Sequence, residues 1–251
     1  EAVLQSGMLA NQPVSRPVEQ REAERTSMSP LRKKLSQKLV SVKNETAMLT
    51  TFNEVDMSEV IRIRKIYQEE FKEKQGVKLG FMSFFTRAVT EALKLYPNVN
   101  SMIEGEEIVH FRYSDIGIAV QTPKGLMVPV IRNADILSLA DIEHKVLDLA
   151  TRGRKNRLTI DELSGGTFTI TNLGALGIES FTPVLNPPQV GILGVCTIQP
   201  KPVNADDGVE FIPHIGLSLT INHQAVDGAP GARFLKILSD RIADFSLSLA
   251  Y

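Results

Sequence analysis

Apolar residues recur along this chain at two different spacings, which predict a mixture of helices and strands. Spacings of three and four residues predict helices within residues 31–39, 60–71, 85–96, 138–149 and 230–245. Alternating or continuous apolar runs predict strands at 48–55, 108–111, 115–120, 126–131, 167–171, 190–195, 209–212 and 215–222. Because the two kinds of element mix without strict alternation, we expect an α/β fold in two layers, a mixed sheet covered by helices.

Individual residues mark three of the helix boundaries. Ser138, followed by Asp141 three positions later, resembles a capping box at the start of the fourth helix. Pro97 is expected to end the third helix, because a proline inside a helix removes a backbone hydrogen bond. Pro230 suits the first turn of the last helix, where no N–H partner is needed.

Residues 1–28 lack this periodicity and are expected to be a flexible linker. They carry Pro13 and Pro17 among many Glu, Gln, Arg and Ser residues. The opening EAVLQSGM (1–8) resembles a protease recognition sequence left from expression, so it is set apart from the fold. Residues 29–251 are long enough for one large domain.

Charge and cysteine content narrow the functional classes. The 28 basic and 29 acidic residues give a net charge of -1, which does not favour a nucleic-acid partner. No apolar run is long enough to span a bilayer and no signal peptide is visible, so no membrane partner is expected. A single cysteine, Cys196, excludes an intrachain disulfide and fits a reducing compartment: the cytoplasm of a bacterium, or the mitochondrial matrix in a eukaryote.

The most informative candidate for chemistry is a histidine directly after the last predicted strand. His223 is followed by Asp227, Gly228 and a new helix. Since side chains alternate along a strand, we expect His223 to continue the buried face of residues 215, 217, 219 and 221. An ordered imidazole is a candidate general base near neutral pH. Taken singly, His223 also fits a structural strand-end residue, and Asp227 an ordinary residue at a helix N-terminus.

A threonine at the end of another predicted strand is a second candidate. Thr167, Thr169 and Thr171 share one face, and β-branched residues are good strand formers, so a structural role is open for all three. Thr171, at the strand end, is also placed to donate a hydrogen bond to a developing oxyanion. Cys196 follows an apolar strand and is interpreted as a small buried hydrophobic residue rather than a nucleophile.

Several other chemistries lack their sequence signals. The four histidines show no paired spacing and there is no second cysteine, so no metal site is expected. Dinucleotide and phosphate-binding glycine motifs are missing, as is the G-x-S-x-G of serine hydrolases.

Seven segments, in order along residues 28–251, carry a family resemblance. They are MSPLRKKL (28–35), AMLTTFNEVDMS (47–58), LGFMSFF (79–85), TPKGLMVPVI (122–131), GGTFTITN (165–172), FTPVLNPPQ (181–189) and HQAVDG (223–228). Together they resemble the catalytic domain of the dihydrolipoyl acyltransferases, the E2 components of 2-oxo acid dehydrogenase complexes. The resemblance implies that residues 29–251 are an acyltransferase catalytic domain with a fold like that of chloramphenicol acetyltransferase.

The resemblance also implies roles for the candidate residues. His223 matches the family's base, which takes a proton from a thiol so that the thiolate attacks a thioester. Thr171 matches the hydroxyl that hydrogen-bonds the tetrahedral intermediate, and no acyl-enzyme forms. Asp227 is assigned an orienting role, through an arginine such as Arg64 or Arg62. The residues that bind coenzyme A are not identified.

The acyl group is indicated less uniformly. Residues 48–54 and 79–83 look like the succinyltransferase branch, which serves 2-oxoglutarate dehydrogenase, whereas 172–178 and 229–235 look more like the acetyltransferase branch. Ile178 and Cys196 stand where succinyl-type members often carry polar residues. Asn222 and Gln224 replace the usual Asp and Arg beside the histidine. We expect succinyl transfer to coenzyme A, with acetyl or branched-chain transfer, or a catalytically inert scaffold, as the alternatives.

The implied partners follow from the same resemblance. The family forms homotrimers with active sites between subunits, and the succinyl type assembles eight trimers into a 24-subunit core. Its other partners are the E1 and E3 components and the lipoyl domain that carries the substrate. The chain shows no lipoyl domain, and family members attach such domains ahead of the segment that starts near Ser29, so we expect a truncated core.

Overall fold

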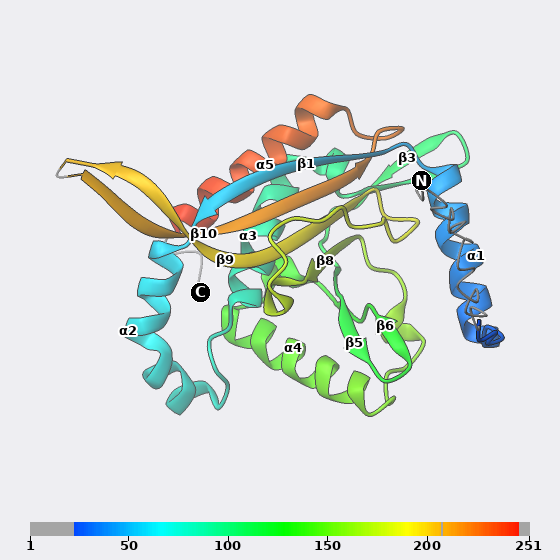
Figure 1. Cartoon of the computed structure of the whole chain (residues 1–251), viewed down its shortest axis with the longest axis horizontal. Coiled ribbons are helices and arrows are strands. Elements are labelled where there is room, and N and C mark those ends of the chain that lie inside the picture. The colour runs from blue at the N-terminus through cyan, green and yellow to red at the C-terminus, as the bar shows by residue number, and fades with distance from the viewer. Residues whose placement is uncertain (1–22, 207, 246–251) are drawn as a thin grey trace, which may run out of the picture.

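The computed structural model describes residues 23–206 and 208–245 (Figure 1). Its α-helices are α1 (Pro30–Glu45), α2 (Ser58–Gln75), α3 (Phe81–Leu95), α4 (Leu139–Arg154) and α5 (Gly228–Ala243). Its strands are β1 (Met48–Asp56), β2 (Ser101–Glu104), β3 (Glu107–His110), β4 (Ile116–Ile118), β5 (Val120–Thr122), β6 (Gly125–Met127), β7 (Val130–Ile131), β8 (Phe168–Asn172), β9 (Gly191–Ala205) and β10 (Gly208–Asn222).

One mixed sheet organises the fold. Its strand order is β1-β10-β9-β8-β4-β7, with two separate hairpins, β2-β3 and β5-β6. The β1, β10 and β9 strands run antiparallel, β8 is parallel to both β9 and β4, and β7 is antiparallel to β4. Helices cover the sheet, which confirms the predicted α/β class (Figure 1).

The main core lies between the sheet and the helices α3 and α5. Leu193 and Val195 of β9 and Leu217 and Leu219 of β10 alternate with smaller residues and are all buried in this core. Phe84 of α3 and Phe234 of α5 are among the core's largest fully buried side chains. Each such side chain contributes roughly 1.5–3 kcal/mol of folding stability through burial. The core therefore holds β9 and β10 in fixed positions.

Most predicted elements are present, with informative differences. The capping box is confirmed, since Ser138 Oγ accepts from the Asp141 backbone N–H at 3.2 Å and Asp141 Oδ2 accepts from the Ser138 N–H at 3.1 Å. The two predicted strands 209–212 and 215–222 form one strand with a bulge between Ile215 and Leu217. A Cβ on Gly216 at that bulge would lie 2.6 Å from the Glu179 carbonyl oxygen, which explains the glycine.

Some boundaries differ from those predicted. The runs 115–120 and 126–131 are each split into two short strands, and β2 was not predicted. The last helix begins at Gly228, two residues before Pro230. Of the predicted linker, residues 1–22 lie outside the described part of the chain, and 23–28 form no helix or strand.

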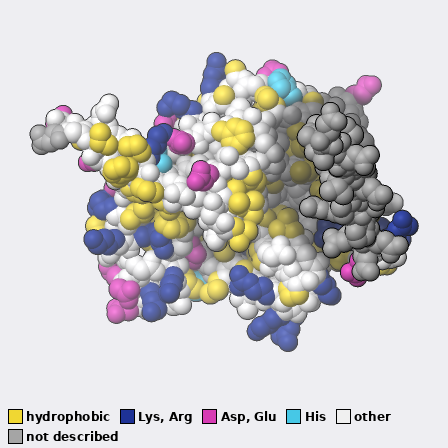
Figure 2. Space-filling view, viewed as in Figure 1, with side chains coloured by type: hydrophobic (Ala, Val, Ile, Leu, Met, Phe, Trp, Pro, Cys, Tyr) yellow, Lys and Arg dark blue, Asp and Glu magenta, His cyan; other side chains and the backbone are white. Residues whose placement is uncertain are grey.

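Two elements extend away from the body and expose apolar side chains. The far end of the β9-β10 hairpin projects from the sheet, and it carries exposed Val209 and Phe211, 63% and 68% accessible (Figures 1 and 2). Helix α1 buries only Val42, which contacts Leu185 and Ile192, while Leu35 and its apolar neighbours along the helix are exposed. Within the described residues, no helix is long and apolar enough to cross a membrane.

Candidate active site

The candidate base, His223, lies at the start of the turn between β10 and α5. Strand β10 ends at Asn222, and the His223 N–H donates to the Ala47 carbonyl at 2.8 Å. Its side chain is 44% exposed, so the expectation that His223 continues the buried strand face was wrong. The physical reason is that strand pairing stops at Asn222, and the chain turns before the alternation can place the imidazole in the core.

Among the residues that the structure describes, Asp227 is the ion-pair partner of this histidine. Asp227 Oδ1 lies 3.9 Å from His223 Nδ1, which is longer than a hydrogen bond, so the pair attracts by charge only when the imidazole is protonated. Asp227 holds the N-cap position of α5, yet its side chain makes no capping hydrogen bond and is 85% exposed. The carboxylate is therefore free of the ordinary structural role at a helix N-terminus.

Gly228 completes this end of the site. A Cβ built on Gly228 would lie 3.8 Å from His223 Nε2, which is ordinary van der Waals distance. The backbone at the start of α5 thus passes close to the outer edge of the imidazole. His223, Asp227 and Gly228 are brought together by one turn.

Thr171 differs from the two threonines that share its face. The Thr167 hydroxyl accepts from the Asp115 N–H, and the Thr169 hydroxyl donates to Gln189 Oε1 at 2.6 Å. Both side chains are buried and serve the fold. Thr171 is half-buried near the end of β8, and its hydroxyl makes no hydrogen bond among the described residues. It is the threonine of the three that is available to a ligand.

One chain does not bring Thr171 and His223 together. Thr171 pairs with Gly194 and Gly194 with Ser218, which places Thr171 two strands from β10. His223 lies five residues beyond Ser218 in the sequence, roughly 16 Å along a strand, and two strand spacings add roughly 10 Å across the sheet. The two side chains are therefore roughly 19 Å apart in one chain, too far to act on one carbonyl.

The arginines proposed to orient Asp227 have other partners in this chain. Arg62 forms a hydrogen-bonded ion pair with Glu59 at 2.6 Å. Arg64 Nε donates to the Leu79 carbonyl at 2.8 Å, and its guanidinium covers the Phe81 ring at 3.9 Å. No ion pair joins Asp227 to either arginine in the part of the chain that the structure describes.

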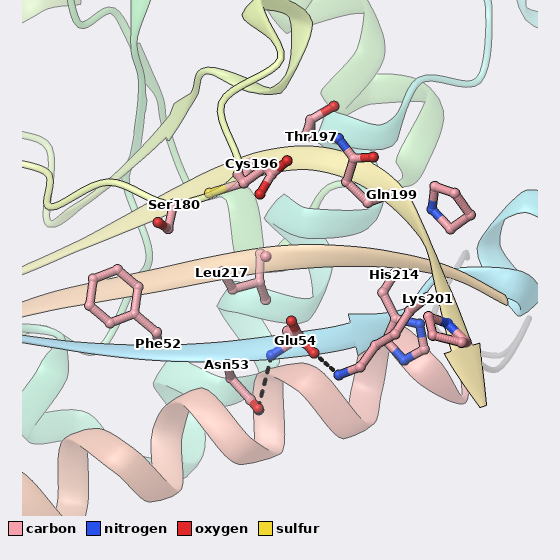
Figure 3. A pocket seen from close by; sticks show the side chains of 14 residues that line it. Phe52, Asn53, Glu54, Ser180, Cys196, Thr197, Gln199, Lys201, His214 and Leu217 are labelled. Carbon is pink, nitrogen blue, oxygen red and sulfur yellow. Dashed lines mark hydrogen bonds and ion pairs between the residues drawn. The ribbon is translucent and has the colours of Figure 1, made fainter. Parts of the chain in front are cut away.

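A cavity of about 810 Å³ opens on the sheet face that also carries Thr171. Strands β1, β9 and β10 supply most of its lining, with Phe52 and Ser180 at one end and His214 and Lys201 at the other (Figure 3). Cys196 follows Gly194, the strand partner of Thr171, by two positions and borders the same cavity. The cavity thus reaches to within one strand of the free hydroxyl.

The cysteine in this wall has the properties of a structural residue. Cys196 is 2% exposed, and burial raises the pKa of its thiol, which lowers the thiolate fraction at neutral pH. The interpretation as a small buried hydrophobic residue is confirmed. Across residues 23–206 and 208–245, no three His, Cys, Asp or Glu side chains gather as metal ligands.

The residues that flank His223 form contacts that sequence patterns did not predict. Asn222 Oδ1 accepts from the backbone N–H groups of Ala47 and Gln224, each at 3.2 Å. Asn222 Nδ2 donates to Gln224 Oε1 at 3.1 Å. The sequence marked both residues as departures from the usual charged pair, but their bonds to one another and to the start of β1 required the fold.

Comparison with known proteins identifies close relatives. Residues 20–250 match the family model described as 2-oxoacid dehydrogenases acyltransferase (catalytic domain). The dihydrolipoyllysine-residue succinyltransferase component of the 2-oxoglutarate dehydrogenase complex from Buchnera aphidicola is 47% identical over 90% of this chain, and that from Escherichia coli is 45% identical over 89%. The chain spans about half the length of these relatives, 55% in each case.

Solved structures agree with this result. The cubic core of the pyruvate dehydrogenase multienzyme complex superposes with a TM-score of 0.86 at 33% identity, and covers 96% of this chain and all of its own. Chloramphenicol acetyltransferase, at 13% identity, superposes with a TM-score of 0.53 over 83% of this chain and 93% of its own. The second likeness shows the fold alone and confirms the predicted fold type.

Proposed function

The chain belongs to the family of 2-oxoacid dehydrogenase acyltransferases, and from this premise we propose that it transfers a succinyl group between a dihydrolipoyl thioester and coenzyme A. The observation that carries the proposal is the high identity, over most of this chain, to succinyltransferase components of 2-oxoglutarate dehydrogenase complexes. The turn that joins His223 to Asp227 supplies a base of the kind this chemistry needs.

The base has a defined task in this reaction. A free thiol has a pKa of about 8.5, so it is mostly protonated at neutral pH. In the proposed reaction His223 takes the proton of the coenzyme A thiol while the sulfur bonds to the thioester carbonyl carbon. A positioned base of this kind contributes roughly 10²–10⁴-fold to the rate. The exposed imidazole is accessible to a thiol that arrives from solvent.

The tetrahedral intermediate then requires a hydrogen-bond donor. We assign this role to the Thr171 hydroxyl, which makes no hydrogen bond within residues 23–206 and 208–245. Collapse of the intermediate breaks the bond between the carbonyl carbon and the lipoyl sulfur, and the departing thiolate takes the proton back from His223. Asp227, 3.9 Å from the ring, stabilises the imidazolium that forms between these steps.

Because these groups lie far apart in one chain, the proposal places each active site between two copies. His223 then comes from one copy and Thr171 from its neighbour, as expected for a homotrimer. The exposed apolar side chains of α1 and of the β9-β10 hairpin support this assembly, since such patches commonly mark contacts with other chains. The likeness to a cubic core supports further assembly of trimers into a 24-subunit particle.

The wider complex follows from the same relatives. We propose that a lipoyl domain delivers the substrate and that the E1 and E3 components act before and after this step. The two relatives are bacterial proteins, which supports the bacterial cytoplasm as the compartment.

One observation favours transfer of an acetyl or branched-chain group in place of a succinyl group. Cys196 is a buried, uncharged residue in the cavity wall, and Ile178 is also apolar; neither offers a charge to the terminal carboxylate of a succinyl group. An acetyl or branched-chain group would need no such partner. Turnover measured with succinyl-dihydrolipoamide and with acetyl-dihydrolipoamide separates the two, and a preference for the acetyl substrate would overturn succinyl specificity.

The test of the reaction itself is removal of the base. His223→Ala is expected to lower acyltransferase turnover by roughly 10²-fold or more. Light scattering should show that its assembly is the same as that of the parent. Turnover near that of the parent would contradict the assigned base. If the parent protein transfers no acyl group to a thiol at all, the chain is an inert scaffold and not an enzyme.

A further inference from the structure

The imidazole of His223 has few contacts of its own that fix its position. In the described part of the chain its ring makes no hydrogen bond, and its one charged neighbour is Asp227 at 3.9 Å. A ring that is 44% exposed is not held by packing on all sides either. Its placement therefore depends on how rigidly the backbone at residue 223 is anchored.

That anchor is formed by two consecutive residues, Asn222 and His223, that hydrogen-bond to Ala47. The Asn222 side chain accepts from the Ala47 N–H at 3.2 Å, and the His223 N–H donates to the Ala47 carbonyl at 2.8 Å. Both backbone polar groups of Ala47 are thus bonded to the site. Ala47 directly precedes β1, whose first residue, Met48, pairs with Asn222, so the start of β1 and the end of β10 are joined at this point.

Asn222 also shapes the turn that follows. Its carbonyl accepts from the N–H groups of Ala225 and Val226, each at 3.0 Å, and its own N–H donates to the Val190 carbonyl at 2.8 Å. Its side-chain oxygen accepts from the Gln224 N–H, and its amide nitrogen donates to Gln224 Oε1. With only 6% exposure, Asn222 is a buried hub that holds the residues on both sides of the histidine.

An amide suits this place for a specific chemical reason. Asn222 Oδ1 faces two backbone donors, and Nδ2 faces an acceptor, so the group must accept at one end and donate at the other. A carboxylate at residue 222 would keep the two accepted bonds, but its second oxygen would meet Gln224 Oε1 unless that amide rotated. A neutral amide also holds the turn without adding a charge next to the base.

We propose that Asn222 and Gln224 are positioning residues that act through His223, an inference that rests on the proposed acyltransferase function. Neither residue needs to touch the substrate. Asn222 fixes the backbone of residue 223 against β1, and Gln224 closes the amide pair on the far side of the turn. Asn222 and Gln224 thus replace a charged anchor with a neutral one.

The test compares steady-state kinetics of variants in the assembled protein. Asn222→Ala leaves the Ala47 and Gln224 N–H groups without their acceptor, and its kcat is expected to fall by roughly 10- to 100-fold, the effect of a misplacement of about 1 Å. KM for coenzyme A should stay close to the parent value, because the variant changes placement of the base and not binding. Asn222→Asp keeps both accepted bonds and is expected to recover most of the lost kcat.

The matched control is a second buried asparagine, whose hydrogen bonds among the described residues lie outside the turn at His223. Asn100 is 4% exposed and donates to the Phe111 and Tyr113 carbonyls at 3.3 and 2.8 Å. Asn100→Ala should lower the melting temperature by an amount similar to Asn222→Ala while kcat stays at the parent value. Equal losses of kcat in the two variants would overturn the proposal, as would Asn222→Ala with the kcat of the parent.

Two further variants keep the outcomes distinct. Gln224→Ala removes an exposed side chain and keeps both bonds that Asn222 Oδ1 accepts, so it should fold even where Asn222→Ala does not. Its kcat is expected to fall severalfold at constant KM, and an unchanged kcat would count against the pair. If His223→Ala retains turnover, the proposed reaction fails; if it is inactive while the Asn222 and Gln224 variants match the parent, only the positioning role fails.

Discussion

Replacement of Thr171 by valine tests the oxyanion role with little disturbance of the fold. Valine keeps the branched shape and removes only the hydroxyl. Since this hydroxyl makes no hydrogen bond among the described residues, its loss leaves no buried partner unsatisfied. We therefore expect the free energy of unfolding to change by no more than about 0.5 kcal/mol, as for other sites without a special contact.

The effect on catalysis should be much larger. Loss of one donor to a tetrahedral intermediate typically lowers kcat by roughly 10²–10³-fold, or about 2.7–4 kcal/mol of transition-state stabilisation. The assay is the rate of thiol-dependent acyl transfer from acyl-dihydrolipoamide to coenzyme A. Thr171→Ser, which keeps the hydroxyl, should recover most of the activity.

The neighbouring threonine supplies the matched control. Thr169 lies two residues earlier on the same face of β8, and its buried hydroxyl donates to Gln189 Oε1 at 2.6 Å. Thr169→Val should cost roughly 1–3 kcal/mol of stability, because that oxygen loses its donor inside the protein, while the folded variant keeps its turnover. A Thr171→Val variant with the kcat of the parent would show that this hydroxyl is not the oxyanion donor. A loss of stability as large as that of Thr169→Val would show that the hydroxyl has a structural partner.

Two further predictions concern the scaffold. The Glu143 carboxylate accepts from the Gly80 and Ser83 N–H groups, and burial raises its pKa above 4.5, so the folded chain binds this proton more tightly than the unfolded chain. Stability from this group is therefore present at low pH and lost as pH rises from about 4.5 through the raised pKa. Denaturation across this pH range should show that the free energy of unfolding of the parent decreases relative to that of Glu143→Gln. A difference between the two that does not depend on pH would contradict this prediction. Arg132 pairs with Asp115 at 2.7 Å and also donates to three carbonyls of the segment 161–165, which begins with a short 3-10 helix. Arg132→Ala should therefore raise amide hydrogen exchange in that segment, and unchanged exchange would show that Arg132 does not hold it in place.

Sequence periodicity predicted the long elements because their signals are local. The apolar faces of α3, α4 and α5 and the alternation of β10 each depend on residues within one element. The bulge at Gly216 was not predicted, since the close approach of the Glu179 carbonyl to that glycine is a tertiary contact. The split of residues 115–120 likewise reflects the partners of β4 and β5, which belong to different sheets.

The candidate site was predictable to a similar degree and for the same reason. His223 and Asp227 lie four residues apart, so one turn brings them together, whereas the exposure of His223 depends on where pairing with β1 ends. The alternation of residues placed the three threonines on one face, but only tertiary contacts distinguish the unbonded hydroxyl of Thr171 from the bonded hydroxyls of Thr167 and Thr169. The side-chain hydrogen bond between Asn222 and Ala47 joins residues 175 positions apart and left no local signal.

In the proposed assembly, His223 of one copy and Thr171 of another form each active site. It can be tested by coexpression of His223→Ala chains with Thr171→Val chains, each of which is expected to be inactive alone. In randomly mixed trimers with heterologous contacts, about one quarter of the sites combine an intact His223 with an intact Thr171. The purified mixture is therefore expected to recover about a quarter of the parent turnover. A mixture as inactive as its separate components would contradict active sites that are shared between copies.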